Sequence, residues 1–223
     1  MGTARVGDKS QIDWDAYWQR SGDGLFKSLL ERVLHRTGFY SLLSRQSIAI
    51  GERLLRDCSV PTIVEVGSGT GTLAFGLGRI RTRRQLCLID IAMSVLQRVK
   101  TGQAQLINAD ISSVPLRDGC CDLSCNIGTI EHFTDPVPII TEMRRISRAH
   151  VLCAVPAPSI IWTIATFVRT LTEQDASLWV ENTRHYSRRQ LAEMFAAAGI
   201  RDIRAEQQTF CGLPLMNIVH GHV

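Results

Sequence analysis

The sequence predicts an α/β fold in which a mostly parallel sheet carries helices on both faces. Short runs rich in β-branched and apolar residues alternate with stretches of helical spacing, and the last two runs follow one another closely, as in an antiparallel pair. A glycine-rich turn follows the first run, where a ligand-binding loop is expected in such a sheet. The runs predicted as strands are 62–66, 85–90, 105–111, 123–127, 150–155, 200–210 and 216–219.

The composition is that of an ordinary globular protein. The 223 residues are 45% hydrophobic and 21% charged, with a formal net charge of +4. This length suits one domain with a substantial core. The basic cluster at Arg79, Arg81, Arg83 and Arg84 falls at a predicted helix end, where cations complement the helix dipole. No nucleic-acid partner is therefore predicted.

The cysteines and the apolar runs bear on metal binding and location. Three of the seven cysteines fall inside predicted strands and are interpreted as small hydrophobes: Cys87, Cys125 and Cys153. The neighbouring pair Cys120 and Cys121 has no C-x-x-C spacing or histidine partner, so no metal is predicted. The start of the chain has no signal-peptide pattern, and the most apolar run, 160–171, is too short to span a bilayer. We expect a cytoplasmic protein without stable membrane insertion.

The glycine turn favours a particular kind of ligand. Gly67, Gly69 and Gly71 allow a tight turn and a close approach of the backbone to a ligand. The third glycine comes one residue earlier than in the G-x-G-x-x-G dinucleotide fingerprint, where Thr72 stands instead. Glu65, inside the apolar strand, would repel a pyrophosphate but attract an ammonium group. Both details favour an adenosine that carries an amino acid, S-adenosylmethionine, over a nicotinamide dinucleotide.

The run V-E-V-G-S-G-T-G resembles motif I (E/D-x-G-x-G-x-G) of the class I S-adenosylmethionine-dependent methyltransferases. Three further segments resemble later motifs of the family, so that the likeness covers about 60–210. They are V-P-L-R-D-G-C-C-D-L, I-E-H-F and H-Y-S-R-R-Q-L. The chain is most similar to the small-molecule, type 11-like branch, although the K-P-G-G turn common in the family is missing.

The resemblance implies a Rossmann-like seven-stranded sheet whose last strand is antiparallel. It also implies that N-terminal helices and a helical insertion cap the active site. We therefore expect a single domain made of an N-terminal helical cap segment, 1–58, and a cofactor-binding core, 59–223. The cap insertion is expected at about 157–184.

Three acids have predicted roles in cofactor binding. Asp90, at the tip of the second strand, is expected to accept hydrogen bonds from both ribose hydroxyls, the alternative being a helix N-cap. The resemblance implies that Asp110 accepts from the adenine amine, the alternative being a plain turn residue. Glu65 is expected to meet the ammonium group of the cofactor. The full predicted set is Glu65, Gly67, Gly69, Gly71, Asp90, Ile91, Asp110, Ile111 and Asn126.

The sequence determines the acceptor site less well than the cofactor site. A base is needed when the acceptor is an alcohol, phenol or ammonium, and imidazole is suited to this near neutrality, so His132 and His185 are the catalytic candidates. Each histidine could equally be a satisfied residue that shapes the wall. The predicted substrate-binding residues are Tyr17, Trp18, Glu131, Trp162 and Tyr186, with aromatic anchoring of a helix as the alternative for Tyr17 and Trp18.

These observations predict an enzyme that methylates an O or N atom of a small acceptor. The chain lacks the N/D-P-P-Y box of nucleic-acid amino-methyltransferases, and the apolar cap with Trp162, Phe167 and Trp179 suggests a hydrophobic or aromatic molecule. Alternatives are C-methylation of a quinone-like ring, a non-catalytic cofactor-binding regulator, and a nicotinamide enzyme. The acceptor's identity and whether the chain forms a homodimer stay open.

Overall fold

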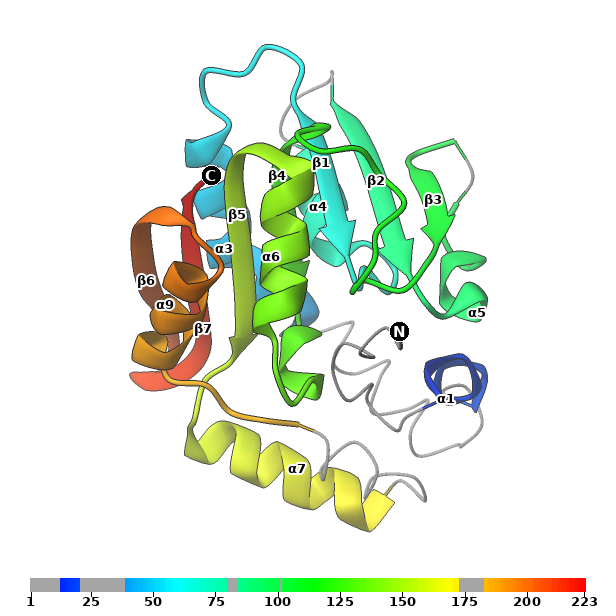
Figure 1. The fold of residues 1–223 in the computed structure, drawn as a ribbon. Coiled ribbons are helices and arrows are strands. Elements are labelled where there is room, and N and C mark those ends of the chain that lie inside the picture. The colour runs from blue at the N-terminus through cyan, green and yellow to red at the C-terminus, as the bar shows by residue number, and fades with distance from the viewer. Residues whose placement is uncertain (1–12, 21–38, 80–83, 101, 173–182) are drawn as a thin grey trace, which may run out of the picture.

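The computed structural model describes residues 13–20, 39–79, 84–100, 102–172 and 183–223. They form a seven-stranded sheet of order β3-β2-β1-β4-β5-β7-β6, in which β7 is antiparallel to both of its neighbours (Figure 1). The predicted fold class is confirmed. The strands are β1 Thr62–Val66, β2 Gln85–Asp90, β3 Gln105–Asn108, β4 Cys121–Ile127, β5 Ser147–Pro156, β6 Arg201–Phe210 and β7 Leu213–His222.

Helices cover both faces of the sheet and the carboxyl ends of its parallel strands (Figure 1). One face carries α6 (Val137–Ile146) and α9 (Arg188–Ala197). The other face carries α3 (Phe39–Leu54) and α4 (Thr72–Gly78). The remaining elements lie at the carboxyl ends of the parallel strands: α1 Trp14–Arg20, α5 Met93–Leu96, the 3-10 helix η1 Ile130–His132 and α7 Ile160–Thr172.

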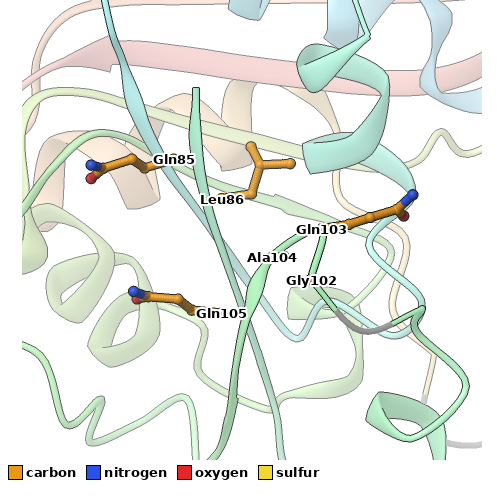
Figure 2. Close-up of a pocket in the computed structure, with 6 residues that line it drawn as sticks. All are labelled: Gln85, Leu86, Gly102, Gln103, Ala104 and Gln105. Carbon is orange, nitrogen blue, oxygen red and sulfur yellow. The ribbon is translucent and has the colours of Figure 1, made fainter. Parts of the chain in front are cut away.

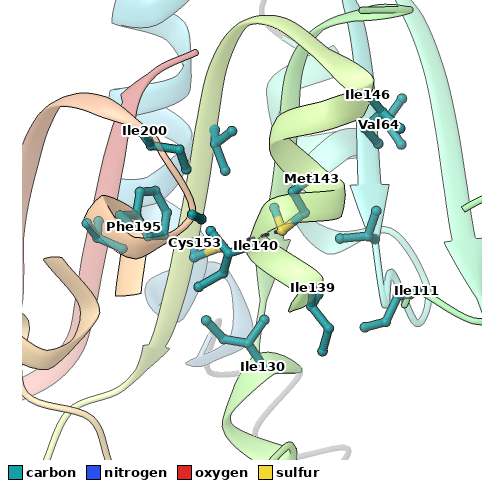
Figure 3. Close-up of a cluster of buried hydrophobic side chains, with 14 of the residues drawn as sticks. Val64, Ile111, Ile130, Ile139, Ile140, Met143, Ile146, Cys153, Phe195 and Ile200 are labelled. Carbon is teal, nitrogen blue, oxygen red and sulfur yellow. Dashed lines mark hydrogen bonds between the residues drawn. The ribbon is translucent and has the colours of Figure 1, made fainter. Parts of the chain in front are cut away.

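The core consists of two hydrophobic clusters separated by the sheet. Figure 3 shows the cluster between the sheet and the helices α6 and α9, with Met143 and Phe195 among its members. The other cluster joins the sheet to α3 and α4. Side chains alternate along β1, so that Val64 belongs to the first cluster and Ile63 to the second. Glu65 therefore shares the face of Ile63 and points toward α4.

Two predicted elements are shorter in the structure. The sequence after β2 predicts a helix through Lys100, but α5 ends at Leu96, and the chain continues in tighter turns in which Val99 N donates to Leu96 O. Strand β3 ends at Asn108 instead of Ile111. The reason is a turn at Asp110, whose carboxylate accepts from the backbone N–H and the hydroxyl of Ser112.

The predicted cap insertion contains α7, which is anchored to β7. Trp162 Nε1 donates to the backbone oxygen of Leu215 at 2.6 Å. The opposite side of α7 shows solvent three apolar side chains at helical spacing: Ile160, Ile164 and Phe167, which are 55%, 56% and 63% exposed. Trp179 lies outside the described residues. Within the described ranges, every helix is too short or too polar to cross a bilayer.

A histidine group at the far end of β5 and β7 makes stability depend on pH. The rings of His150 and His222 meet edge to face, with centroids 5.2 Å apart. Burial lowers the pKa of His150, and the charges of His222 and His220 lower it further. Burial also lowers the pKa of His220, against the opposing effect of Glu206.

We expect the contribution of His150 and His220 to the free energy of unfolding to fall as the pH drops from 7 to 5. In the unfolded chain these histidines titrate near pH ~6.5, so the unfolded state binds protons more readily than the folded state over this range. Urea unfolding across the range should show that wild type loses stability relative to His150→Gln as the pH falls. Equal slopes for wild type and His150→Gln would contradict this assignment.

Candidate functional site

The turn between β1 and α4 is built from glycines with left-handed backbone angles. The φ angles of Gly67, Gly69 and Gly71 are 61°, 52° and 78°. A Cβ on Gly67 would lie 2.4 Å from Thr129 Cγ2, and one on Gly71 would lie 2.7 Å from Leu88 Cδ1. Thr129 also donates its hydroxyl to Gly67 O at 2.9 Å, which fixes the turn against the end of β4. Only glycine suits the first and third positions of this turn.

Glu65 is fully buried below this turn. Its carboxylate accepts from Ala74 N at 2.7 Å and from Leu73 N at 3.4 Å, in the first turn of α4. Burial raises the pKa of Glu65 to about 8, although these two hydrogen bonds oppose the shift. A buried acid needs hydrogen-bond donors, and for Glu65 these are backbone N–H groups in the first turn of α4, which have no partner within the helix. The predicted contact with the cofactor's ammonium group stays a prediction.

Asp90 connects the ends of β1 and β2. Its carboxylate accepts from Gly69 N at 2.8 Å and from Ala92 N at 2.9 Å. Burial raises the pKa of Asp90, and the backbone hydrogen bonds oppose the shift. Ile91, the next residue, exposes half of its apolar side chain beside this acid. A carboxylate that holds the glycine turn, with an exposed apolar residue next to it, is the arrangement expected for a nucleoside site.

The predicted cofactor set is completed by Asp110, Ile111 and Asn126. Asp110 begins the turn after β3, and the side chain of Ile111 belongs to the core, so only the backbone of Ile111 is available to a ligand. Asn126, near the end of β4, is fully buried and donates Nδ2 to Val66 O at 2.6 Å. The polar group missed by the sequence analysis is Asn108, which donates to Asp90 O and Ile91 O and so fixes the end of β2.

Helix α1 lies over the glycine turn. The ring of Trp18 lies 3.6 Å from the position that a Cβ on Gly69 would take, and the Arg98 guanidinium stands 5.9 Å from the centre of this ring. Asp15 accepts from Ser94 N at 2.8 Å, so α1 is tied to the start of α5. Tyr17 packs edge to face on Trp18, with centroids 5.7 Å apart. The structure thus brings both predicted aromatic residues to the site.

The other end of α1 covers His132. The rings of Trp14 and His132 have centroids 4.9 Å apart, and Thr183 Oγ1 lies 3.4 Å from His132 Nδ1. Trp14 was not among the predicted site residues. The run of aromatic residues at 14–18 indicated a packing or binding role for this segment. It did not indicate a contact with His132, because the two residues are far apart in the sequence.

The remaining predicted acceptor residues separate in the structure. Glu131 is buried at the end of β4, whereas His185 is exposed. Tyr186 packs in the core and donates its hydroxyl to Phe133 O at 3.1 Å. Trp162 is held by β7, as described above. Of these four, Glu131 lies nearest to His132, whereas Tyr186 and Trp162 have positions that packing alone accounts for.

A separate depression of about 420 Å³ lies beside the amino ends of β2 and β3 (Figure 2). Among the described residues, its lining contains no charged or nucleophilic side chain, and it lies at the amino ends of the strands, whereas the glycine turn follows a carboxyl end. It is therefore not part of the candidate site. The lining residues are Gln85, Leu86, Gly102, Gln103, Ala104 and Gln105.

The fold and this site define a class of protein. A sheet of order 3-2-1-4-5-7-6 with a glycine turn after its first strand and an acid after its second is that of the class I S-adenosylmethionine-dependent methyltransferases. Residues 64–155, which carry the turn and both acids, match the family described as "Methyltransferase domain". The sequence-based recognition of this class, and of S-adenosylmethionine as its cofactor, is confirmed.

Curated relatives point to the same class. The chain is 25% identical, over 186 residues, to the "Probable S-adenosylmethionine-dependent methyltransferase" of Mycobacterium tuberculosis strain H37Rv. The match covers 82% of this chain and 62% of the relative, so the chain spans less than two thirds of that protein's length.

Solved structures share the fold at low sequence identity. Magnesium protoporphyrin IX methyltransferase from Synechocystis PCC 6803, with bound S-adenosylhomocysteine, is 11% identical with a TM-score of 0.63, covering 96% of this chain and 95% of that one. An S-adenosylmethionine-dependent methyltransferase from Thermotoga maritima is 15% identical with a TM-score of 0.58, covering 87% and 98%. The carbon methyltransferase CurJ is 10% identical with a TM-score of 0.60, covering 75% and 50%.

Proposed function

We propose that this protein transfers the methyl group of S-adenosylmethionine to an O or N atom of a small, hydrophobic or aromatic molecule. The observation that carries the proposal is the assembly at the carboxyl ends of β1, β2 and β4. There a glycine turn, the buried carboxylate of Asp90 and the aromatic cover of α1 surround one region.

The residues present fit the cofactor. Each oxygen of the Asp90 carboxylate accepts one backbone hydrogen bond and keeps lone pairs for ribose hydroxyls. Ile91 offers an exposed apolar surface for the adenine ring, and Asp110 stands at the end of β3 for its amine. Trp18 and the glycine turn would enclose the remaining part and exclude water.

The bound cofactor supplies an electrophilic methyl group, and the chain supplies position. Methyl transfer is an in-line displacement, in which good alignment contributes about 7–11 kcal/mol. His132, Trp14 and Glu131 lie at the end of β4 and would form the wall on the acceptor side. The exposed apolar face of α7 supports a hydrophobic acceptor, since it extends the cap at this end of the sheet.

Two other functions compete with this proposal. C-methylation of a quinone-like ring would use the same cofactor site, and product analysis with a labelled methyl group would distinguish it. A cofactor-binding regulator would bind S-adenosylhomocysteine but transfer no label to any acceptor. Retention of Asp90, Asp110 and the complete glycine turn in one site favours an enzyme.

The test of the proposal is calorimetry with S-adenosylhomocysteine, followed by transfer of label from S-adenosylmethionine to a pool of extracted small molecules. We expect saturable binding and label in a small, organic-soluble product. A wild-type protein that gives no heat with S-adenosylhomocysteine would refute the assignment of the site.

His132→Ala is expected to slow turnover about tenfold while the dissociation constant of S-adenosylhomocysteine stays within about twofold. The reason is that His132 contacts Trp14 and Thr183 on the acceptor side and has no described contact with Asp90 or the glycine turn. Steady-state rates and calorimetry on the same preparation check this. Equal losses of rate and affinity would mean that His132 only supports the fold.

A further inference from the structure

Glu131 differs from the other buried carboxylates of the described chain. Glu65 and Asp90 each accept two backbone N–H groups, and Asp122 receives the Arg148 guanidinium and Thr62 N. Glu131 is 1% exposed, and its Oε2 has no hydrogen-bond partner among the described residues. A buried acceptor without a donor costs about 1–3 kcal/mol, and more when it is charged.

A second unpartnered oxygen lies close by in the fold. Asn126 is fully buried, and its Nδ2 donates to Val66 O, but its Oδ1 has no partner in the described part of the chain. Asn126 pairs in register with Cys153 of β5, whose pKa is raised first by burial and then by the charge of Glu131. Figure 3 shows Cys153 and Ile130 on this side of the sheet. Cys153 thus links Asn126 and Glu131, which both lie near the carboxyl ends of β4 and β5.

A glycine with a left-handed backbone conformation lies beside the carboxyl group. Gly128, directly after β4, has a φ of 73°, and a Cβ on it would lie 3.7 Å from Glu131 Oε1. The backbone oxygen of Glu131 accepts from Arg184 N at 2.9 Å, so the loop before α9 fixes η1 in place. The backbone of Glu131 is thus tied to the loop before α9, and its carboxyl group lies beside a position that has no side chain.

We propose that Glu131 receives the N–H or O–H group of the acceptor and takes the proton that methyl transfer releases. This rests on the proposed function. The bond between the methyl carbon and sulfur breaks, a bond between that carbon and the acceptor atom forms, and the proton moves from that atom to the Glu131 carboxylate. The products are the methylated acceptor, the neutral thioether of the cofactor and a neutral carboxyl group. His132, covered by Trp14, then orients the acceptor instead of removing its proton.

Burial makes the Glu131 carboxylate, once it has lost its proton, a stronger base than an exposed carboxylate. Burial raises its pKa to about 8, and its own backbone amide opposes the shift. The titratable groups that face it are Cys153 of β5 and Tyr186 before α9, and the charge of Glu131 raises the pKa of each. His132 is its neighbour in the chain. The raised pKa of Glu131 follows from its burial and is consistent with the assignment, which rests on the position of its unpartnered oxygen.

The test uses protein saturated with S-adenosylhomocysteine and three aromatic probes of similar size. Phenol and benzylamine carry donors, whereas toluene carries none. Calorimetry is expected to show that wild type binds the two donor probes at least tenfold more tightly than toluene. Glu131→Met should reduce this preference to less than threefold. The control Glu193→Gln, at an exposed ion pair with Arg189, should leave it unchanged.

A second measurement separates proton transfer from binding. Glu131→Gln keeps the size of the side chain and should lower label transfer to the acceptor pool at least 100-fold, with thermal unfolding showing a folded protein. Equal affinity for the three probes, or a preference that survives Glu131→Met, would overturn the proposal. So would a crystal soaked with phenol in which water alone lies beside Oε2. Failure of the proposed function would look different, since wild type would then not bind S-adenosylhomocysteine.

Discussion

Asp90→Ala is expected to raise the dissociation constant of S-adenosylhomocysteine more than tenfold. Hydrogen bonds from hydroxyls to a carboxylate contribute about 1.5–3 kcal/mol each, and the variant loses both predicted ribose contacts. It also leaves Gly69 N and Ala92 N without their acceptor, so the glycine turn is less well ordered. Isothermal calorimetry measures the effect directly.

The control for this prediction is Asp118→Ala. Asp118 is an exposed acid paired with Arg145 on the far side of the core, and its loss should leave the dissociation constant unchanged. Asp90→Asn keeps the size and one acceptor oxygen, so its affinity should lie between wild type and Asp90→Ala. An unchanged affinity in Asp90→Ala would refute the ribose assignment.

Glu65→Ala is expected to lower the free energy of unfolding by about 3 kcal/mol. The fully buried carboxylate is the acceptor for Leu73 N and Ala74 N, and its removal leaves two buried amides unpaired beside a cavity. Urea denaturation monitored by circular dichroism checks the value. A loss below about 1 kcal/mol would mean that water replaces the carboxylate at the start of α4.

Glu65→Gln keeps the size of the side chain but cannot ionise, so it separates the effects of packing and of charge on the free energy of unfolding. It should cost less than alanine at pH 7, because one acceptor oxygen remains. The raised pKa of about 8 means that the folded state of wild type holds a proton on Glu65 below that pH, which the unfolded state releases above its ordinary value of 4.5. The stability this proton confers is lost as the pH rises through about 8. Glu65→Gln should therefore reduce the loss of stability that occurs as the pH rises from about 4.5 to about 8, and Glu131→Gln should do the same at its own site.

Local patterns predicted the cofactor side of the site better than the acceptor side. The glycine turn and Asp90 follow directly from the residues at two strand ends, and parallel strands bring those ends together. The partner of Glu65 depended on which face of β1 meets α4. The contact between Trp14 and His132 joins residues far apart in sequence, so no local spacing could reveal it. Tyr186 was predicted to bind substrate, but its ring packs in the core and its hydroxyl donates to Phe133 O.

The short helix α1 has a consequence for the order of events in a reaction cycle. Trp18 covers the glycine turn at one end of the helix and Trp14 covers His132 at the other, while Asp15 ties the helix to α5. A single rigid-body displacement of α1 would therefore expose both the nucleoside site and the acceptor site. Departure of the spent nucleoside and departure of the methylated compound would then require the same displacement of α1.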